Sequence, residues 1–559
     1  MWGIDLPLLL VTLPLIGGVA AFPAKPRDSR GPAALFLLIA IIIGAGVAVF
    51  AFVALAADGD IVSVVGGWEA GVGIHLLLDG AAVVLITCVY LISGAIVLFA
   101  QGEGGYGSIF YGILGIAIAG MVGVILSADL FNLFVFLEVL SLAATMLIAY
   151  KRRLPALYAA FRYLLLCSLS AALYLVGLFI LYRETGELSF YAVALGAEGG
   201  SAAVSTAGIL LFAGVALRAA MVPFHAWLPD AHGQAPHPVS ALLSGLVLKA
   251  SILALWRIVT LLPRVSPLLL AAGAVSAVGG VAAALVQRDT KRLLAFHSIS
   301  QMGLVAAAAG AGGAAAALYH AVGHALFKSL LFLALGYIIL LRDERDIYAL
   351  AKRSGEGGAA GATLFLLIGS AAIAGIPPFV GFASKTALAG AFKETQLYTL
   401  LRIVSTGTVA SFIKLSLVVG RPRRLLPRRA APGARVSDNR DRGGESSHLP
   451  PGPAGRRLCY AAMGVLALGV AALGIFPAGI LSLASQVGVR VALDDGGVYT
   501  GSGILESFLI LLSGSLLYLL IRRPILAKPI AWLEKRRTGV DGALALVSGG
   551  VLAALFLVR

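Results

Sequence analysis

The sequence predicts an all-α protein that crosses a membrane many times, and three observations support this prediction. Hydrophobic residues make up 60% of the chain and charged residues only 12%, with a mean hydropathy of +0.97, far from the composition of soluble globular proteins. Apolar windows of about 18 residues or more, each long enough to cross roughly 30 Å of hydrocarbon, recur along almost the whole chain. The basic residues gather in alternate loops between these windows.

The apolar windows predict sixteen membrane spans, and the first of them is interpreted as a retained helix. The basic stretch of residues 23–30 that follows it contains no convincing cleavage site for a signal peptidase. The sixteen windows lie near residues 5–22, 33–56, 77–100, 108–127, 129–150, 156–182, 205–226, 238–262, 267–286, 292–311, 315–341, 362–391, 400–419, 459–480, 503–521 and 541–558.

The distribution of basic residues predicts the orientation of the chain in the membrane. If the N-terminus lies outside and the spans alternate, 29 lysines and arginines fall in inner loops and five in outer loops. This asymmetry follows the positive-inside rule and predicts that a long basic loop, residues 421–458, lies in the cytoplasm. The protein itself is expected in the inner membrane of the cell. The net charge of +15 is therefore a topology signal, and no nucleic-acid partner is expected.

Five charged residues lie deep inside predicted spans. Arg218, Lys249, Lys328 and Lys385 are the deep bases, and Glu138 is the one clearly central acid. Charges at the bilayer centre are costly and usually line an internal ion path. The excess of bases means that water fills the space between them or that some lysines lose their proton, because burial disfavours the charged form. Arg162, Arg257, Arg402 and Lys414 lie nearer to helix ends and are expected to extend to the interface.

Prolines predict two broken helices. Pro223 interrupts the span that carries Arg218, and Pro377 and Pro378 divide the segment 362–391 just before Lys385. Proline frees backbone carbonyls, which need water, side chains or an ion as partners. The two breaks are five spans apart and so run in opposite directions, a pattern typical of an inverted repeat of five helices. The expected units are N-terminal helices (1–104), a first repeat (105–262), a second repeat (267–420), the basic loop (421–458) and C-terminal helices (459–559).

His320, His324 and Lys328 recur every four residues and therefore lie on one face of a helix. A proton relay is the preferred interpretation, because histidine titrates near neutral pH. Helix packing and zinc binding are the alternatives, but no third metal ligand is evident, and no metal is expected.

No cofactor is expected in this chain. Cys88, Cys167 and Cys459 lack the spacing of an iron–sulfur site, and no nucleotide-binding motif is visible. The basic segment 421–458 is rich in proline, glycine and arginine and is expected to be disordered. Either it is a solvated inner loop that sets topology, or it docks on an acidic partner or anionic lipid.

Six ordered motifs closely resemble the antiporter-like subunits of respiratory complex I, Mrp-type sodium/proton antiporters and membrane-bound hydrogenases. They include DLFNLFVFLEVLSLA, MVPFHAWLPDAH, DTKRLLAFHSISQMG, HAVGHALFKSLLFL and GIPPFVGFASK, within residues 105–420, and the tail near 492–505 resembles the D-type Mrp subunit. The resemblance implies fourteen core helices, here followed by about two more at the C-terminal end. It also implies a charged axis along the membrane midplane.

The resemblance assigns roles to four of the deep charges. Glu138 matches the family's glutamate, Lys249 its connecting lysine, Lys328 a central lysine and Lys385 the terminal lysine on the second broken helix. The family places a lysine where this chain has Arg218, which cannot release a proton at physiological pH. Arg218 is then either a fixed charge that tunes Glu138, which lysine could replace, or a planar clamp, which lysine could not.

The predicted function is ion translocation within a multisubunit membrane complex. The chain would conduct protons, with sodium as a candidate coupled ion, in an Mrp-type antiporter or in the proton-pumping module of a dehydrogenase or hydrogenase. Its partners would be other membrane subunits and the lipid bilayer. The alternative from another class is a membrane partner that supplies proton flow to a soluble enzyme accumulating inorganic carbon.

Overall fold

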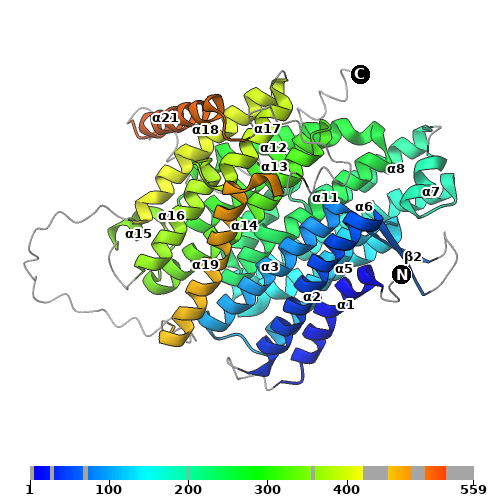
Figure 1. Ribbon diagram of the computed structural model, residues 1–559, viewed down its shortest axis with the longest axis horizontal. Coiled ribbons are helices and arrows are strands. Elements are labelled where there is room, and N and C mark those ends of the chain that lie inside the picture. The colour runs from blue at the N-terminus through cyan, green and yellow to red at the C-terminus, as the bar shows by residue number, and fades with distance from the viewer. Residues whose placement is uncertain are drawn as a thin grey trace, which may run out of the picture.

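The computed structural model describes residues 5–24, 31–66, 73–197, 200–353, 359–393, 395–419, 451–479, 482 and 498–523. Long helices, packed side by side, make up nearly all of this part of the chain (Figure 1). Twelve described helices are long and apolar enough to cross a membrane, and α1, α8 and α16 are shorter apolar helices. The prediction of an all-α polytopic membrane protein is therefore confirmed, whereas this count does not establish fourteen core helices.

Each of the first fifteen predicted spans contains a helix. The long ones are α1 (Leu6–Ala21), α2 (Pro32–Asp58), α3 (Gly80–Glu103), α4 (Ser108–Leu126), α5 (Leu130–Ile148), α6 (Leu154–Thr185), α8 (Ala202–Arg218), α11 (Leu248–Leu261), α12 (Ser266–Val286), α13 (Thr290–Gly310), α14 (Ala314–Arg342), α16 (Ala360–Ala374), α17 (Val380–Phe392), α18 (Gln396–Ser416), α19 (Pro453–Ile475) and α21 (Gly501–Ile521). The sixteenth window, 541–558, and residues 421–450 of the basic loop lie outside the described residues.

Short elements connect these helices. They are α7 (Phe190–Gly196), α9 (Trp227–Gln234), α10 (His237–Leu242) and α15 (Ile347–Lys352), with a π-helical turn at Leu243–Val247. A two-stranded antiparallel sheet, β1 (Ile61–Val65) with β2 (Ile74–Leu78), joins α2 to α3, with Ile61 opposite Leu78. This hairpin was not expected from the sequence. Its strands, IVSVV and IHLLL, do not alternate strictly between apolar and polar residues, which is the pattern that indicates a half-buried strand.

One kind of backbone pairing occurs twice in the described part of the chain, once within each of the two units expected from the sequence. Asp129 caps the start of α5 and bridges to Ser189, which caps α7, while Asp289 caps the start of α13 and bridges to Asp346, which caps α15. The flanking backbone bonds also correspond: Leu130 N–Leu188 O and Phe190 N–Ala128 O match Thr290 N–Arg345 O and Ile347 N–Arg288 O. The start of α5 thus contacts the turn that follows α6, and the start of α13 contacts the turn that follows α14.

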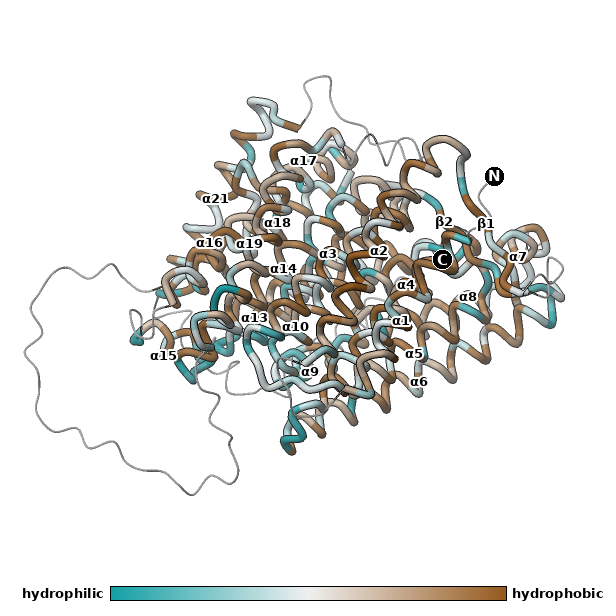
Figure 2. The backbone as a smooth tube through the Cα atoms, turned by 60° about the horizontal axis from the view of Figure 1, so that its bottom comes forward, coloured by the Kyte–Doolittle hydropathy of each residue, from teal (hydrophilic) through white to brown (hydrophobic). Residues whose placement is uncertain are grey.

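Small residues bring α12 and α13 close together. A Cβ on Gly273 of α12 would lie 2.4 Å from Ala307 N of α13, and one on Gly303 of α13 would lie 2.4 Å from Ala277 N. Such close backbone approach is how helices associate in lipid, where no hydrophobic force drives them together. Hydrophobic segments dominate the helix bodies, and hydrophilic segments gather near α9 and α15 (Figure 2).

The C-terminal helices α19 and α21 pack against helices from different parts of the chain. Helix α19 lies along α3, where a Cβ on Gly102 would be 2.5 Å from Gly455 O. It also contacts α14, because the Tyr319 hydroxyl donates to Leu473 O at 2.7 Å. Helix α21 lies beside α18 at the periphery (Figure 1), where most of its side chains are exposed.

Candidate functional site

The first broken helix ends at Arg218. Helix α8 stops there, Ala220 adopts a left-handed backbone with φ of 52°, and the chain passes Pro223 before α9 begins at Trp227. The indole of Trp227 donates to Leu217 O at 2.9 Å and so satisfies one carbonyl freed at the helix end. The break places the Arg218 side chain, 3% exposed, between α5 and α6.

Arg218 is held by five acceptors. Its guanidinium pairs with the Glu138 carboxylate and also donates to the Ser141 hydroxyl, to Leu137 O at 2.6 Å, to Ser170 Oγ at 2.7 Å and to Cys167 O at 3.4 Å. A lysine offers three donors and no planar fork, so it could not reproduce this set. The geometry matches the clamp interpretation of Arg218.

Lys249 lies two residues beyond the π-helical turn. Its ammonium donates to Ser244 O within that turn and lies 2.6 Å from Nδ1 of His324 on α14. A π-turn frees carbonyls from the regular helical ladder, and such turns are frequent at functional sites. At 2.6 Å a proton can be shared between an amine and an imidazole nitrogen, both of which are buried here.

Two backbone carbonyls and a pair of serine hydroxyls lie between Lys249 and Lys328. Lys328, which is fully buried, donates to Leu294 O at 2.6 Å. The Ser298 hydroxyl lies 3.1 Å from the same carbonyl and 2.6 Å from the hydroxyl of Ser244, the residue whose carbonyl accepts from Lys249. The two ammonium groups are therefore joined through polar atoms of α13 and of the π-turn.

His320 extends this row towards the second broken helix. Its Nε2 lies 3.1 Å from Gln301 Oε1 and its Nδ1 lies 3.0 Å from the hydroxyl of Ser384 on α17. Because Gln301 Oε1 can only accept, Nε2 carries a proton and Nδ1 accepts from Ser384 in this arrangement. Ser384 directly precedes Lys385, so the histidine and the terminal lysine share one contact region.

The second break lies between Ala374 and Val380. Lys385 on α17 reaches back across it and donates to Ile373 O at 2.8 Å. Helix α21 supplies a further donor, because Ser507 Oγ donates to Gly375 O at 2.7 Å. The hydroxyl of Tyr499, two residues before α21, lies 3.2 Å from Pro378 O and 2.5 Å from Gly474 O, its nearer acceptor. The carbonyls freed at Pro377 and Pro378 thus obtain side-chain partners, as the proline pattern predicts.

The three lysines of the row have no carboxylate partner within ion-pair distance among the described residues. Lys249 and Lys328 are at most 4% exposed, and Lys385 is 8% exposed. No hydrogen bond within the described ranges joins the Glu138–Arg218 pair to Lys249. The predicted residues therefore form two groups. One is the pair of Glu138 and Arg218, and the other, called the lysine–histidine row, consists of Lys249, His320, His324, Lys328 and Lys385. In the described part of the chain no group of three metal-ligating side chains occurs.

Two of the four residues expected to extend to the interface are buried. Arg257, 5% exposed, pairs with Asp79 at 3.2 Å and donates to Ser127 O at 2.7 Å. Lys414, 6% exposed, donates to the carbonyls of Ala284, Leu285 and Gln287 at the end of α12. A base near a helix end can cap the carbonyls of a neighbouring helix, and both side chains do so here at helix ends within the bundle. Arg162 and Arg402 keep side-chain exposures of 38% and 49%.

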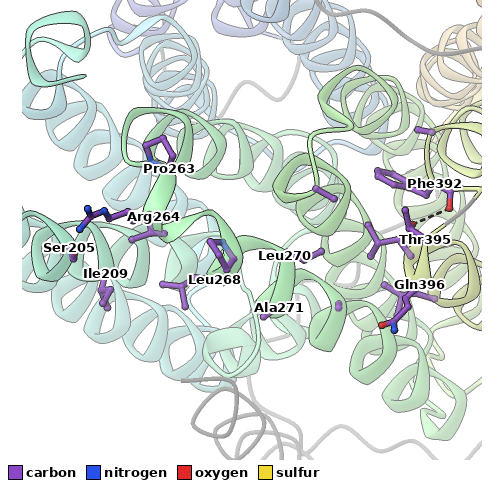
Figure 3. A pocket seen from close by; sticks show the side chains of 17 residues that line it. Ser205, Ile209, Pro263, Arg264, Leu268, Leu270, Ala271, Phe392, Thr395 and Gln396 are labelled. Carbon is purple, nitrogen blue, oxygen red and sulfur yellow. Dashed lines mark hydrogen bonds between the residues drawn. The ribbon is translucent and has the colours of Figure 1, made fainter. Parts of the chain in front are cut away.

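A cavity of about 1250 Å³ lies apart from the row. It opens between α8, α12, α17 and α18 and is lined mostly by apolar side chains, with Arg264 at one side (Figure 3). A small cavity of about 40 Å³ touches Lys249 beneath Trp256 and Leu318, and another of about 40 Å³ touches Lys385.

Sequence reasoning missed the contribution of α21 to the second break. Glu506 and Ser507 line the cavity beside Lys385, although their helix lies more than one hundred residues away in sequence. A lone acid, Glu506, within the apolar window 503–521 was the available signal.

Residues 127–411 match the model of a protein family that is described as the transmembrane region of NADH:quinone oxidoreductase/Mrp antiporter. Among curated relatives, subunit N of NADH-quinone oxidoreductase from Desulforudis audaxviator is 32% identical over 446 residues, covering 74% of this chain and 85% of that protein. The putative antiporter subunit mnhD2 of Staphylococcus aureus is 29% identical over 364 residues, covering 62% and 72%.

Two solved complexes contain chains of the same fold. One is the membrane-bound sulfane sulfur reductase, an archaeal respiratory membrane complex (TM-score 0.72, 25% identity, 91% of this chain and 99% of that chain). The other is the Mrp complex from Dietzia sp. DQ12-45-1b (TM-score 0.74, 24% identity, 89% and 99%). The matched length and the identity to its relatives show that this chain belongs to the NADH:quinone oxidoreductase/Mrp antiporter family and is an antiporter-like membrane subunit of such complexes.

Proposed function

We propose that the chain conducts protons through the membrane along the lysine–histidine row, with Glu138 and Arg218 at one end and Lys385 at the other. Sodium is the candidate coupled ion if the complex is an antiporter. The single observation that carries the proposal is the contact of 2.6 Å between Lys249 and His324 in a fully buried setting. Two groups that can each hold or release a proton lie there without a carboxylate to fix the charge.

The arrangement supports transfer in steps. A proton held by Lys249 can pass to His324. The backbone carbonyls of Ser244 and Leu294 hold Lys249 and Lys328 in place but cannot carry a proton, so transfer to Lys328 needs a water molecule between the two lysines. His320 and Ser384 then lead to the position of Lys385. Each neutral lysine or imidazole can accept the next proton, so no buried group must carry more than one charge.

The test uses the whole complex, purified under mild detergent with its copurifying subunits and reconstituted into vesicles. Lys249→Ala should lower proton flux, followed with a pH-sensitive dye, by roughly a hundredfold, the scale of removing one proton-transfer group. Lys352→Ala, at an exposed position, is the matched control and should leave the flux unchanged. Full proton flux in Lys249→Ala would overturn the proposal. The identity of the copurifying subunits shows whether the complex is an antiporter or a respiratory complex.

The orientation is part of the same proposal: the N-terminus lies outside the inner membrane and the basic loop lies in the cytoplasm. The charge asymmetry of 29 against five supports it. Arg153→Cys should be labelled by an impermeant maleimide only from the cytoplasmic side, and Lys393→Cys only from the outside. The native cysteines Cys88, Cys167 and Cys459 are buried and should give little background. Labelling of both positions from one side would contradict this topology.

A further inference from the structure

Helix α21 is apolar and mostly exposed, apart from one short polar face. Glu506 is its single charged residue, and Ser507 and Ser513 are directed at neighbouring elements. An acid within a membrane-spanning helix is costly unless it has a partner or a hydrated space. The position of Glu506 therefore requires an explanation beyond lipid contact.

Three contacts fix how α21 lies on the second break. Ser507 Oγ donates to Gly375 O at 2.7 Å, and the hydroxyls of Thr406 on α18 and Ser513 on α21 lie 3.1 Å apart. Further along, a Cβ on Gly514 would lie 2.5 Å from Val409 Cβ. The contacts advance along α18 and α21 together, so the two helices are parallel and begin at the same end of the bundle.

A small cavity separates Glu506 from Lys385. Its volume of about 40 Å³ is enough for about one water molecule, and both ionisable side chains line it, together with Ser405, Ser507 and Thr386. The hydroxyl of Ser405, which is 1% exposed, has no hydrogen-bond partner in the described part of the protein. A buried polar atom of this kind calls for a water at this place.

The alternative is that Glu506 only neutralises Arg402. Their closest atoms are 3.8 Å apart, and the Arg402 side chain is 49% exposed, so this pair contributes little. Tyr398 of α18 also interacts with Glu506. The carboxylate therefore lies between a weak, partly exposed cation on one side and the cavity with Lys385 on the other.

We propose that Glu506 is the acid that exchanges protons with Lys385 across this cavity, so that α21 completes the path beyond the second broken helix. The ammonium of Lys385 gives a proton to the water, which passes a proton to the Glu506 carboxylate. Lysine is left as a neutral amine and glutamate as a neutral acid. Glu506 then releases the proton at the end of the bundle where α18 and α21 begin, and Lys385 is free to accept another from the Ser384–His320 side.

The inference rests on the proposed function, and the experiment separates the two. In reconstituted complex, Glu506→Gln should lower proton flux roughly tenfold or more. Arg402→Gln, which removes the ion pair and the cation over the Tyr398 ring but retains the acid, should stay within about twofold of the parent. Glu506→Asp, which retains an acid, should recover part of the flux and should be measured in place of the glutamine variant if the latter fails to assemble. Near-parental flux in Glu506→Gln, or equal losses in Glu506→Gln and Arg402→Gln, would overturn the inference.

A second readout does not depend on transport. Infrared difference spectra of the complex between acidic and alkaline pH should contain a carboxylic acid band that disappears in Glu506→Gln and persists in Arg402→Gln. Its absence from the parent would overturn the role of Glu506. If Lys249→Ala abolishes flux while Glu506→Gln does not, only the inference about α21 fails; if both variants retain full flux, the proposed row fails as well.

Discussion

The two broken helices hold their basic residues in different ways. At the first break Arg218 is paired with Glu138 and donates to four further acceptors. At the second break Lys385 donates to one backbone carbonyl, Ile373 O, and faces a small cavity rather than a carboxylate in direct contact. The first is a closed set of hydrogen bonds, and the second retains an open side.

This difference separates a structural charge from an exchangeable one. Arginine keeps its proton at any physiological pH, and five acceptors leave it no room to move. Lysine with a single neutral acceptor can release its proton when burial disfavours the charge. The comparison suggests that the first break acts as a fixed positive anchor for Glu138, while the second is where a proton is taken up and released.

The largest expected effect is structural and falls on the first break. Arg218→Ala leaves the Glu138 carboxylate without its cation. The free energy of unfolding should fall by an amount near the lower end of roughly 3–5 kcal/mol, because the Glu138 side chain is 30% exposed. Arg218→Lys should also lose stability, because three donors cannot satisfy five acceptors. Thermal unfolding and the yield of assembled complex measure both; a parental melting temperature in Arg218→Lys would show that the clamp is unimportant.

At the second break the expected effect is functional. Lys385→Ala should assemble normally, because only one carbonyl loses its donor, yet proton flux should fall roughly a hundredfold. Lys385→Arg should be similarly inactive, because arginine retains its proton. Flux in proteoliposomes decides, and an active Lys385→Arg variant would remove the distinction between the two breaks.

Glu138→Gln tests whether the anchored acid also takes part in transfer. Arg218 keeps its bonds to Ser170, Ser141, Leu137 O and Cys167 O, so we expect assembly with flux reduced roughly tenfold or more. Glu184→Gln, which removes an exposed acid paired with Arg183, is the control and should have parental flux. Equal flux in both variants would leave Glu138 as a purely structural partner.

The smallest effect on transport is expected at Lys414. Its ammonium donates to three carbonyls at the end of α12, so Lys414→Ala should destabilise the protein by about 1–3 kcal/mol while flux stays within about twofold. Calorimetry and the vesicle assay measure the two quantities. A loss of flux as severe as that of Lys385→Ala would place Lys414 on the path.

The sequence predicted the helices and their interruptions well, because apolar length and proline act locally. The first fifteen predicted spans contain helices, and the residues flanking Pro223, Pro377 and Pro378 leave the helical path. It did not identify partners that come from a distant segment. The guanidinium of Arg257 forms an ion pair with the carboxylate of Asp79, nearly 180 residues earlier in the chain. Depth along one helix does not reveal which side chains of other helices surround a group.

The sequence by itself determined the class of the protein, its spans, the deep charges and the departure at Arg218, because each depends on composition, local backbone chemistry or a side chain's own titration range. Only the tertiary structure decided that Arg218 satisfies five acceptors and that Lys249 meets His324. The same holds for the contact of α21 with the second break through Ser507 and Glu506. The reason is physical: a buried charge is stabilised or left exchangeable by atoms within a few ångströms. In a helical bundle most of those atoms belong to segments far away along the chain.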